Sequence, residues 1–361
     1  MSRMLLIFLA FALCCAMVRA DTIQQPVQIG AILPLTGDFA FVGRAIQAGA
    51  QMRLAEETGK RLAFRFEDDH TYERKSIVSA FRKLTSVNNV PLVFLTVAPA
   101  MAPISSLIPQ TKVPTIAVWD FNEGMHQPKD FKYSMGYSNE AAGEAMAELA
   151  RHVLELPRVA VVTAHDEWST LLAKTFMSRF EHLGGVAEEV AQVDLNDSDL
   201  GAIVLKAKQR NDPAIYFPLY LSSVSSLVRQ CRQLGYSGAL LTGEGLTEPE
   251  VKVLGALAEG VYFQRIWVSD PNFQTKYAKF SGETKQPADI GFVGLGYDMA
   301  SLAIEVVDAL AKSNHSITAP NIQELMQTKK FKGVTGEVDF QNFRGKRIST
   351  LQLVEGKIVP K

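Results

Sequence analysis

Residues 158–185 read RVAVVTAHDEWSTLLAKTFMSRFEHLGG, and their hydrophobic pattern changes halfway along. The first seven residues form a short apolar run, which is typical of a buried strand. The stretch from residue 167 onwards has apolar residues at helical spacing and ends in two glycines. A buried strand followed by a helix is the repeating unit of a parallel sheet covered by helices.

The same alternation continues on both sides of this stretch. Apolar strands are expected at 27–35, 61–70, 90–97, 214–220 and 238–245, and helices at 43–59, 73–86 and 222–235. Such runs favour an α/β fold whose parallel sheets are covered on both faces. After about residue 267 the pattern breaks: a long helix is expected at 296–313, and residues 336–359 alternate like an antiparallel hairpin. Because no low-complexity linker separates the halves, several chain crossings are expected to join two lobes.

The first twenty residues have the pattern of a secretory signal peptide. Arg3 precedes an apolar run from Met4 to Val18, and cleavage is expected before Asp21. The run is shorter than the roughly 20 residues of a membrane span. A lipid anchor at Cys14 or Cys15 is the alternative, although the preceding Leu13 is larger than the residue such attachment usually requires. The mature protein is thus expected to be exported and soluble, with no later membrane helix.

Composition excludes several classes of partner. The 37 basic and 38 acidic residues nearly balance, and no basic run occurs, so neither nucleic acid nor an anionic membrane is an expected partner. Cys231 is the only cysteine after the leader, and we expect a packed, inert thiol. No CxxC motif or His/Cys cluster suggests a metal, and no cofactor is expected. At about 150 residues per domain, the length suggests two domains.

Catalytic patterns are weak. His165, Asp166 and Glu167 follow a predicted strand, but adjacent loop residues rarely converge on one point, so a solvated loop tip is the favoured interpretation. The sequence has no GxSxG, phosphate-loop or HExxH motif. We therefore expect a protein that is not an enzyme.

Glu244 lies between Gly243 and Gly245 where a predicted strand ends. A buried charge is costly unless it is solvated or paired. Trp119, Trp168 and Tyr220 stand at or just after the ends of other predicted strands. Ligands of open α/β sheets bind beyond these carboxyl ends, so the four residues are expected to share a cleft. Aromatic walls and one buried charge suit a small cationic or aromatic ligand.

Four segments resemble type I periplasmic substrate-binding proteins of the branched-chain amino-acid-binding group. They are 29–52 (IGAILPLTGDFAFVGRAIQAGAQM), 158–185, 212–236 (DPAIYFPLYLSSVSSLVRQCRQLGY) and 331–348 (FKGVTGEVDFQNFRGKRI). The resemblance implies two Rossmann-like lobes, parallel sheets flanked by helices, and a hinge of three crossings. It places residues 21–139 and 267–333 in the first lobe, and 140–266 and 334–361 in the second.

The resemblance also implies a function. Such a protein captures an amino acid or related small molecule between its lobes in the periplasm and delivers it to the permease of an ABC importer. We expect it to act as a monomer. A sensing subunit of the same fold, signalling to a membrane receptor or kinase, is the alternative. Neither of these two functions requires a cofactor.

The resemblance assigns site residues as well. The family's ammonium-binding acid falls on Glu244, a ligand-facing tyrosine on Tyr220, and Trp168 stands where many members have tyrosine. The alternative for Glu244 is to cap the helix expected near 247–250.

The first-lobe positions depart from the family pattern. Ala100 replaces a common serine, Trp119 and Phe121 lie near positions that are usually small or threonine, and Val42 stands where an aromatic is frequent. Asp120 adds polarity beside them. Without the usual hydroxyl groups, leucine, isoleucine and valine are expected to bind poorly, and planar or aromatic ligands, including aromatic carboxylic acids, to bind better.

Overall fold

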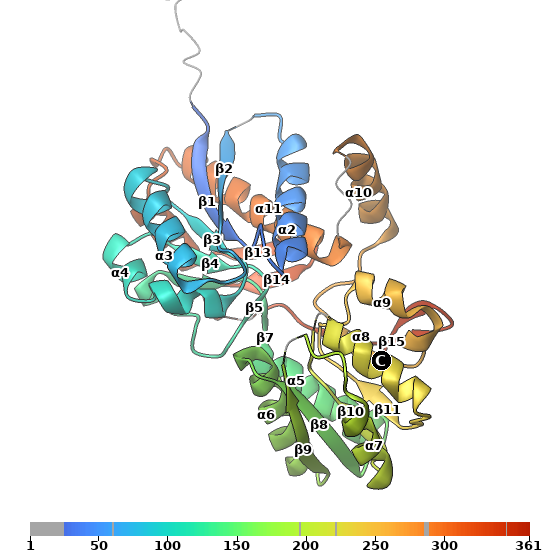
Figure 1. The fold of residues 1–361 in the computed structure, drawn as a ribbon. Helices are drawn as coiled ribbons and strands as arrows, with labels where there is room; N and C mark the ends of the chain where they lie inside the picture. The colour runs from blue at the N-terminus through green and yellow to red at the C-terminus, as the bar shows by residue number, and fades with distance from the viewer. Residues whose placement is uncertain (1–24, 60, 195, 221, 285–288, 344) are drawn as a thin grey trace, which may run out of the picture.

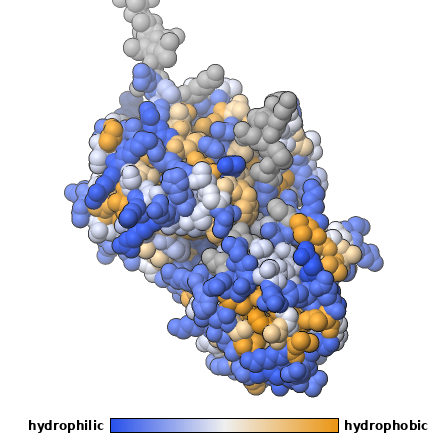
Figure 2. Space-filling model, viewed as in Figure 1, coloured by the Kyte–Doolittle hydropathy of each residue, from blue (hydrophilic) through white to orange (hydrophobic). Residues whose placement is uncertain are grey.

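The computed structural model describes residues 25–59, 61–194, 196–220, 222–284, 289–343 and 345–361. The predicted signal peptide lies outside these residues. The chain forms two α/β lobes that meet at a narrow waist (Figure 1). The surface seen in Figure 2 is mainly hydrophilic, with smaller hydrophobic patches on both lobes.

The first lobe is built on a parallel sheet. Its strands follow the order β2 (Leu62–Asp68), β1 (Val27–Leu33), β3 (Val93–Leu95), β4 (Thr115–Ala117) and β6 (Lys132–Ser134). The helices on one face are α2 (Ala40–Ala55), α10 (Pro271–Thr284), α11 (Ile290–Lys312) and α12 (Ala319–Met326). The other face is covered by α3 (Arg74–Arg82), a π-helical turn (Lys83–Val87), a 3₁₀ segment (Ala98–Ile104) and α4 (Leu107–Thr111). A short 3₁₀ turn, Pro128–Asp130, precedes β6.

The second lobe has a larger, mixed sheet. Its strand order is β16 (Lys357–Pro360), β15 (Ser349–Val354), β12 (Tyr262–Arg265), β11 (Ala239–Leu241), β10 (Ala214–Tyr216), β8 (Arg158–Ala164) and β9 (Val186–Val193). β8 to β12 pair in parallel, whereas β15 is antiparallel to both β12 and β16. One face carries α5 (Asn139–Glu148), a π-helical turn (Leu149–Val153) and α6 (Glu167–His182). The other carries α7 (Gly201–Gln209), α8 (Ser222–Gln233), α9 (Glu248–Leu254) and a 3₁₀ turn (Gly255–Ala258).

The hairpin expected over residues 336–359 is wrong as a single unit. β14 (Gly336–Asp339) turns back onto β13 (Lys330–Gly333), while β15 pairs with β16 in the other lobe. The reason is burial: Phe340 packs into the first-lobe core and Leu351 into the second-lobe core. We therefore propose that the last crossing between lobes follows Phe340, later than the boundary expected at residue 334.

The waist holds chain segments from distant parts of the sequence. β5 (Asp120–Phe121) pairs in parallel with β7 (Tyr137–Ser138), and both lie between the lobes (Figure 1). The backbone N–H of Lys346 donates to the Gly136 carbonyl at 2.7 Å, which brings the last crossing beside the first.

A buried ion pair anchors this last crossing to α11. Lys346 Nζ lies 3.0 Å from Asp298 Oδ2 and 2.6 Å from Thr335 Oγ1, and neither side chain of the ion pair is exposed. Burial lowers the pKa of Lys346, and the Asp298 carboxylate opposes that shift. Because each charge is compensated only by the other and by hydrogen bonds, the pair depends on this one arrangement.

Helix α11 is long and apolar enough to cross a membrane by length and composition, although no membrane helix is expected from the sequence. Its most hydrophobic window is 72% buried inside the protein, so it is the core helix of the first lobe. Cys231, the cysteine of α8, is also buried, and burial raises its pKa to about 12. The inert thiol expected from the sequence agrees with this environment.

Contact between α2 and α11 requires glycine at both surfaces. A Cβ at Gly49 would lie 1.9 Å from the Val293 carbonyl oxygen, and a Cβ at Gly296 would lie 1.8 Å from that of Ile46. Gly296→Ala is therefore expected to lower the free energy of unfolding by about 1–3 kcal/mol, as other overpacked cores do.

Urea denaturation measures this effect, with Gly282→Ala in α10 as the control. A Cβ at Gly282 meets nothing within 4 Å, so alanine there is expected to be neutral or stabilising. Equal stability of the two variants would contradict the close helix contact.

Candidate ligand-binding site

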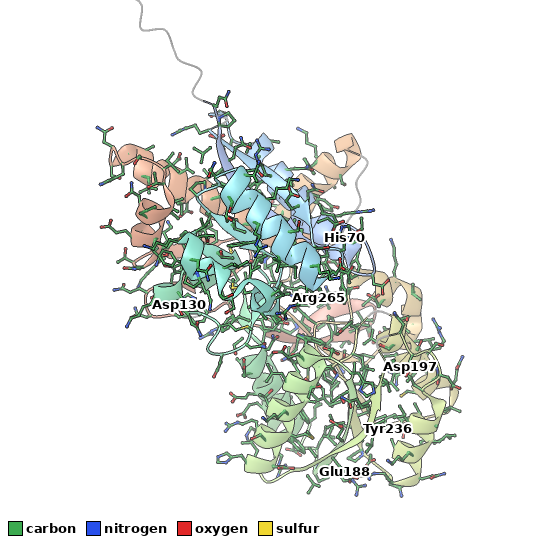
Figure 3. The ribbon with its side chains drawn as sticks, turned by 60° about the vertical axis from the view of Figure 1, so that its left-hand side comes forward. His70, Asp130, Glu188, Asp197, Tyr236 and Arg265 are labelled. Atoms are coloured by element: carbon green, nitrogen blue, oxygen red, sulfur yellow. The ribbon has the colours of Figure 1, made fainter. Side chains whose placement is uncertain are left out.

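A cavity of about 260 Å³ lies between the two lobes. The first lobe contributes Phe39, Phe41, Tyr72, Ile77, Val97, Pro99, Ala100, Pro103, Trp119, Asp120 and Phe292. The second lobe contributes Asp166, Glu167, Trp168, Tyr220, Glu244, Gly245, Thr247 and Glu250. Figure 3 shows Arg265, the last residue of β12, at the junction of the lobes.

Five of the seven residues assigned to ligand binding from the sequence line this cavity: Ala100, Trp119, Trp168, Tyr220 and Glu244. They lie at the carboxyl ends of the strands, the edge of each sheet at which the sequence predicts a cleft. Their shared placement agrees with the expected cleft, and their contact with a ligand stays a prediction.

Val42 and Phe121 do not line the cavity, which corrects their assignment. Val42 is fully buried against the first-lobe sheet, because its position on α2 faces inward. Phe41, one residue earlier, supplies the aromatic side chain instead. Phe121 is 4% exposed and packs edge-on against Phe343, with ring centroids 4.7 Å apart. In each case an adjacent residue, Phe41 or Asp120, lines the cavity instead.

The glycines beside Glu244 permit close packing of the backbone. A Cβ at Gly245 would lie 1.8 Å from the Leu219 carbonyl oxygen, so no side chain fits there. A Cβ at Gly243 would lie 3.1 Å from the Trp168 indole. Neither glycine has a positive φ, so close approach is the requirement that they meet.

Glu244 is 8% exposed and already has protein partners. The indole N–H of Trp119 donates to Glu244 Oε2 at 2.6 Å, and the backbone N–H of Ile266 donates to Oε1 at 2.7 Å. Burial raises the pKa of Glu244, while these two donors and nearby Arg265 oppose the shift. Since Trp119 belongs to the first lobe, its hydrogen bond joins the lobes beside the cavity.

The alternative role of Glu244 as a helix cap finds no support in these contacts. Helix α9 begins after Thr247, and the N–H of Glu248 in its first turn donates to Asp289 Oδ2 at 3.1 Å. The Glu244 carboxylate instead accepts hydrogen bonds from Trp119 and Ile266, which lie outside α9.

Aromatic rings form much of the cavity wall. Phe39 contacts Tyr72 and Tyr220, with ring centroids 5.5 and 5.3 Å apart, and Tyr220 contacts Trp168 at 5.4 Å. The pair of Phe39 and Tyr220 crosses from one lobe to the other. The rings therefore form a continuous wall that links the two lobes.

Asp120 is the acidic residue on the first-lobe side, and it is 4% exposed. Its Oδ2 accepts from Asn139 Nδ2 at 2.9 Å, whereas its buried Oδ1 has no hydrogen-bond partner. Burial raises the pKa of Asp120 to about 7; Asn139 opposes this shift and Glu244 adds to it. The Tyr72 hydroxyl is also buried without a partner.

Sequence reasoning missed Phe39, Tyr72 and Glu250 and gave Asp120 only a general polar role. The position of Asp120 directly after Trp119 was a usable signal, because both fall at one strand end. The other three lie on loops or helix ends whose approach to the cavity depends on the tertiary fold.

Of the histidine and acids at 165–167, Asp166 and Glu167 line the cavity and His165 does not. Asp166 caps α6 by accepting from the Ser169 N–H at 2.9 Å, and Glu167 accepts from Asn122 at 2.8 Å. His165 is exposed and outside the cavity. Across the residues that the structure describes, no group of three or more His, Cys, Asp or Glu side chains is placed to hold a metal ion.

Comparison with known proteins gives one consistent result. The sequence model of a family described as periplasmic binding protein matches residues 26–357. The Leu/Ile/Val-binding protein homolog 3 of Brucella melitensis is 27% identical over 257 residues, which cover 68% of each chain.

Solved structures support the same fold. A leucine-binding protein from Thermotoga maritima is 24% identical, with a TM-score of 0.77 over 93% of this chain and 97% of that one. A solute-binding protein of an ABC transporter from R. palustris, solved with benzoate, is 18% identical, with a TM-score of 0.75 over 93% and 95%. These likenesses confirm the expected α/β fold. Because the family match extends through both lobes, the chain belongs to the periplasmic binding protein family.

Proposed function

We propose that this protein is the substrate-binding component of an ABC importer. The main support for this proposal is the cavity between the lobes, because residues of both lobes line it. The family is not enzymatic, which confirms the expectation that the protein is not an enzyme. The relatives' names, which mention leucine, isoleucine, valine and benzoate, support a small organic ligand.

The contacts between lobes support a clamp-like action. The Trp119–Glu244 hydrogen bond and the Phe39–Tyr220 ring contact can form only when the lobes are close. A ligand that binds this closed state better than an open one shifts the population toward closure. The closed, monomeric form in the periplasm would then engage the permease.

The wall favours a ligand with a planar or aromatic body. Val97, Pro99, Ala100 and Pro103 present no side-chain hydroxyl to the cavity from the first lobe. A ring can stack on the aromatic wall for about 0.5–1.5 kcal/mol beyond its buried area. We therefore propose an amino acid or related small molecule that carries a ring, in preference to leucine, isoleucine or valine.

Calorimetry on the mature chain tests this function with amino acids, aromatic carboxylates and aromatic amines. A ring-bearing compound is expected to bind saturably near micromolar Kd, which corresponds to about −8 kcal/mol. Trp119 and Trp168 should change their fluorescence on binding, because both line the cavity. Saturable binding of leucine without binding of any ring compound would contradict the ligand class, and no binding across the panel would contradict the function.

A further inference from the structure

We infer that the cavity is built for the ammonium group of a small aromatic amine, which binds without needing a carboxylate. This inference rests on the proposed function, since it names the ligand class of the same cavity. It assigns the ammonium to Asp120, a residue of the waist strand β5.

The charges around the cavity have one sign. The carboxyl-bearing residues of its wall are Asp120, Asp166, Glu167, Glu244 and Glu250. Among the described residues that line it, none is lysine, arginine or histidine. Arg265 acts electrostatically on Glu244 but does not line the cavity. Its guanidinium donates to the Leu246 carbonyl at 2.9 Å and lies 3.9 Å from Asp289, while its Nε has no hydrogen-bond partner. A carboxylate ligand would therefore face like charges, whereas an ammonium would be attracted.

Asp120 Oδ1 identifies the position within this acidic wall. It is a buried carboxylate oxygen without a hydrogen-bond partner, on a residue that lines the cavity. Such an acceptor is costly until a donor reaches it. An ammonium group brings three N–H donors and the opposite charge, so it can satisfy Oδ1 and still reach the unpartnered Tyr72 hydroxyl nearby.

Glu244 is less suited to the direct contact. Each of its oxygens already accepts one strong hydrogen bond, from Trp119 and from Ile266. The ammonium site thus moves from Glu244, which the family resemblance suggested, to the first-lobe side of the cavity. Glu244 still adds negative potential there, since it raises the pKa of Asp120.

The aromatic wall suits the remainder of such a ligand. Trp119 and Phe292 contact each other edge-on, with centroids 4.7 Å apart, beside Asp120. Trp168 and Tyr220 line the second-lobe side. A cation near these ring faces gains cation–π attraction, and the ligand ring gains stacking contacts.

Three compounds with the same ring test the inference by calorimetry at pH 8: 2-phenylethylamine, phenylalanine and 3-phenylpropionate. The first carries only an ammonium group, the second carries both an ammonium and a carboxylate group, and the third carries only a carboxylate group. The amine is expected to bind at least 100-fold more tightly than 3-phenylpropionate. Equal or tighter binding of the anion overturns the inference, as does failure of the amine while another compound of the wider panel binds; the proposed function survives both results. No binding by any compound defeats the proposed function itself.

The pH dependence gives a second readout. The groups that act on Asp120 are Glu244 and Glu140, which raise its pKa, and Asn139, which lowers it. Tyr72 and Tyr137, the other titratable neighbours, are neutral in this range because burial raises their pKa values further. With a pKa of about 7, Asp120 must lose a proton before it pairs with an ammonium. Amine affinity should therefore fall several-fold from pH 8 to pH 6, and unchanged affinity overturns the assignment.

Asp120→Asn tests the residue itself. The amide keeps an oxygen for Asn139 but removes the charge, so amine affinity should fall at least tenfold and lose its pH dependence. The thermal midpoint of the free protein at pH 8 should not decrease, because a buried carboxylate is removed. Asp308→Asn in α11 is the matched control outside the cavity: Asp308 pairs with Arg61 at 3.1 Å on the surface, and less than threefold loss is expected. Equal losses in the two variants overturn the assignment.

Discussion

Lys346→Met is expected to lower the free energy of unfolding by about 3–5 kcal/mol, because it leaves the Asp298 carboxylate charged and buried without its partner. The methionine preserves most of the side-chain volume, so the loss reports mainly on charge. Urea denaturation monitored by circular dichroism measures it. Lys332→Met is the matched control, since its ion pair with Glu337 is 82% and 71% exposed and should contribute little.

A second substitution separates charge from packing. Asp298→Asn in the Lys346→Met background removes the unpaired charge while keeping an acceptor for the Val334 N–H, which donates to Asp298 Oδ1 at 2.7 Å. Part of the lost stability should return. If the double variant is less stable than Lys346→Met alone, the ion pair is not the source of the effect.

Glu244→Gln is expected to weaken ligand binding by about 1.5–3 kcal/mol, the range for hydrogen bonds to charged groups. A glutamine has one acceptor oxygen, so it cannot serve both the Trp119 indole and the Ile266 N–H. The closed arrangement of the lobes loses stability, and any cationic ligand also loses negative potential. Calorimetry measures the affinity, and the tryptophan emission should shift as the indole loses its acceptor.

Trp119→Phe supplies the partner variant. It removes the same indole donor but keeps an aromatic ring near Phe292. If the hydrogen bond between Trp119 and Glu244 carries the effect, the double variant should lose less affinity than the two single losses combined. Strict additivity would show that the two residues act independently.

The sequence predicted the strand and helix units closely where the local pattern was strong. The strand expected at 158–164 is β8 itself, and the following helix begins at Glu167 as expected. Buried parallel strands produce continuous apolar runs, and helices produce a clear period, so both signals are local. Gly245 beside Glu244 was equally informative, because a Cβ there would lie 1.8 Å from the Leu219 carbonyl oxygen.

Other features depend on contacts that local patterns do not contain. Val42 and Phe41 are neighbours, and only the packing of α2 decides which one faces the cavity. The pairing of β14 with β13 follows from the burial of Phe340 in the first-lobe core. The strands that come next in the sequence belong to the second lobe. Asp120 was visible in the sequence, but its unpartnered oxygen was not.

The C-terminal part of the chain returns to both lobes, and this affects when the protein can fold during its synthesis. The first-lobe core combines Ile29 and Phe94 with Met299 and Phe340, and the second-lobe sheet acquires β15 and β16 only from the last residues. Because the ribosome makes the N-terminus first, neither lobe has a complete core until synthesis is nearly finished. Contacts between such distant segments slow folding. Such a delay would suit the export that the N-terminal sequence predicts, because a chain crosses a secretion channel unfolded.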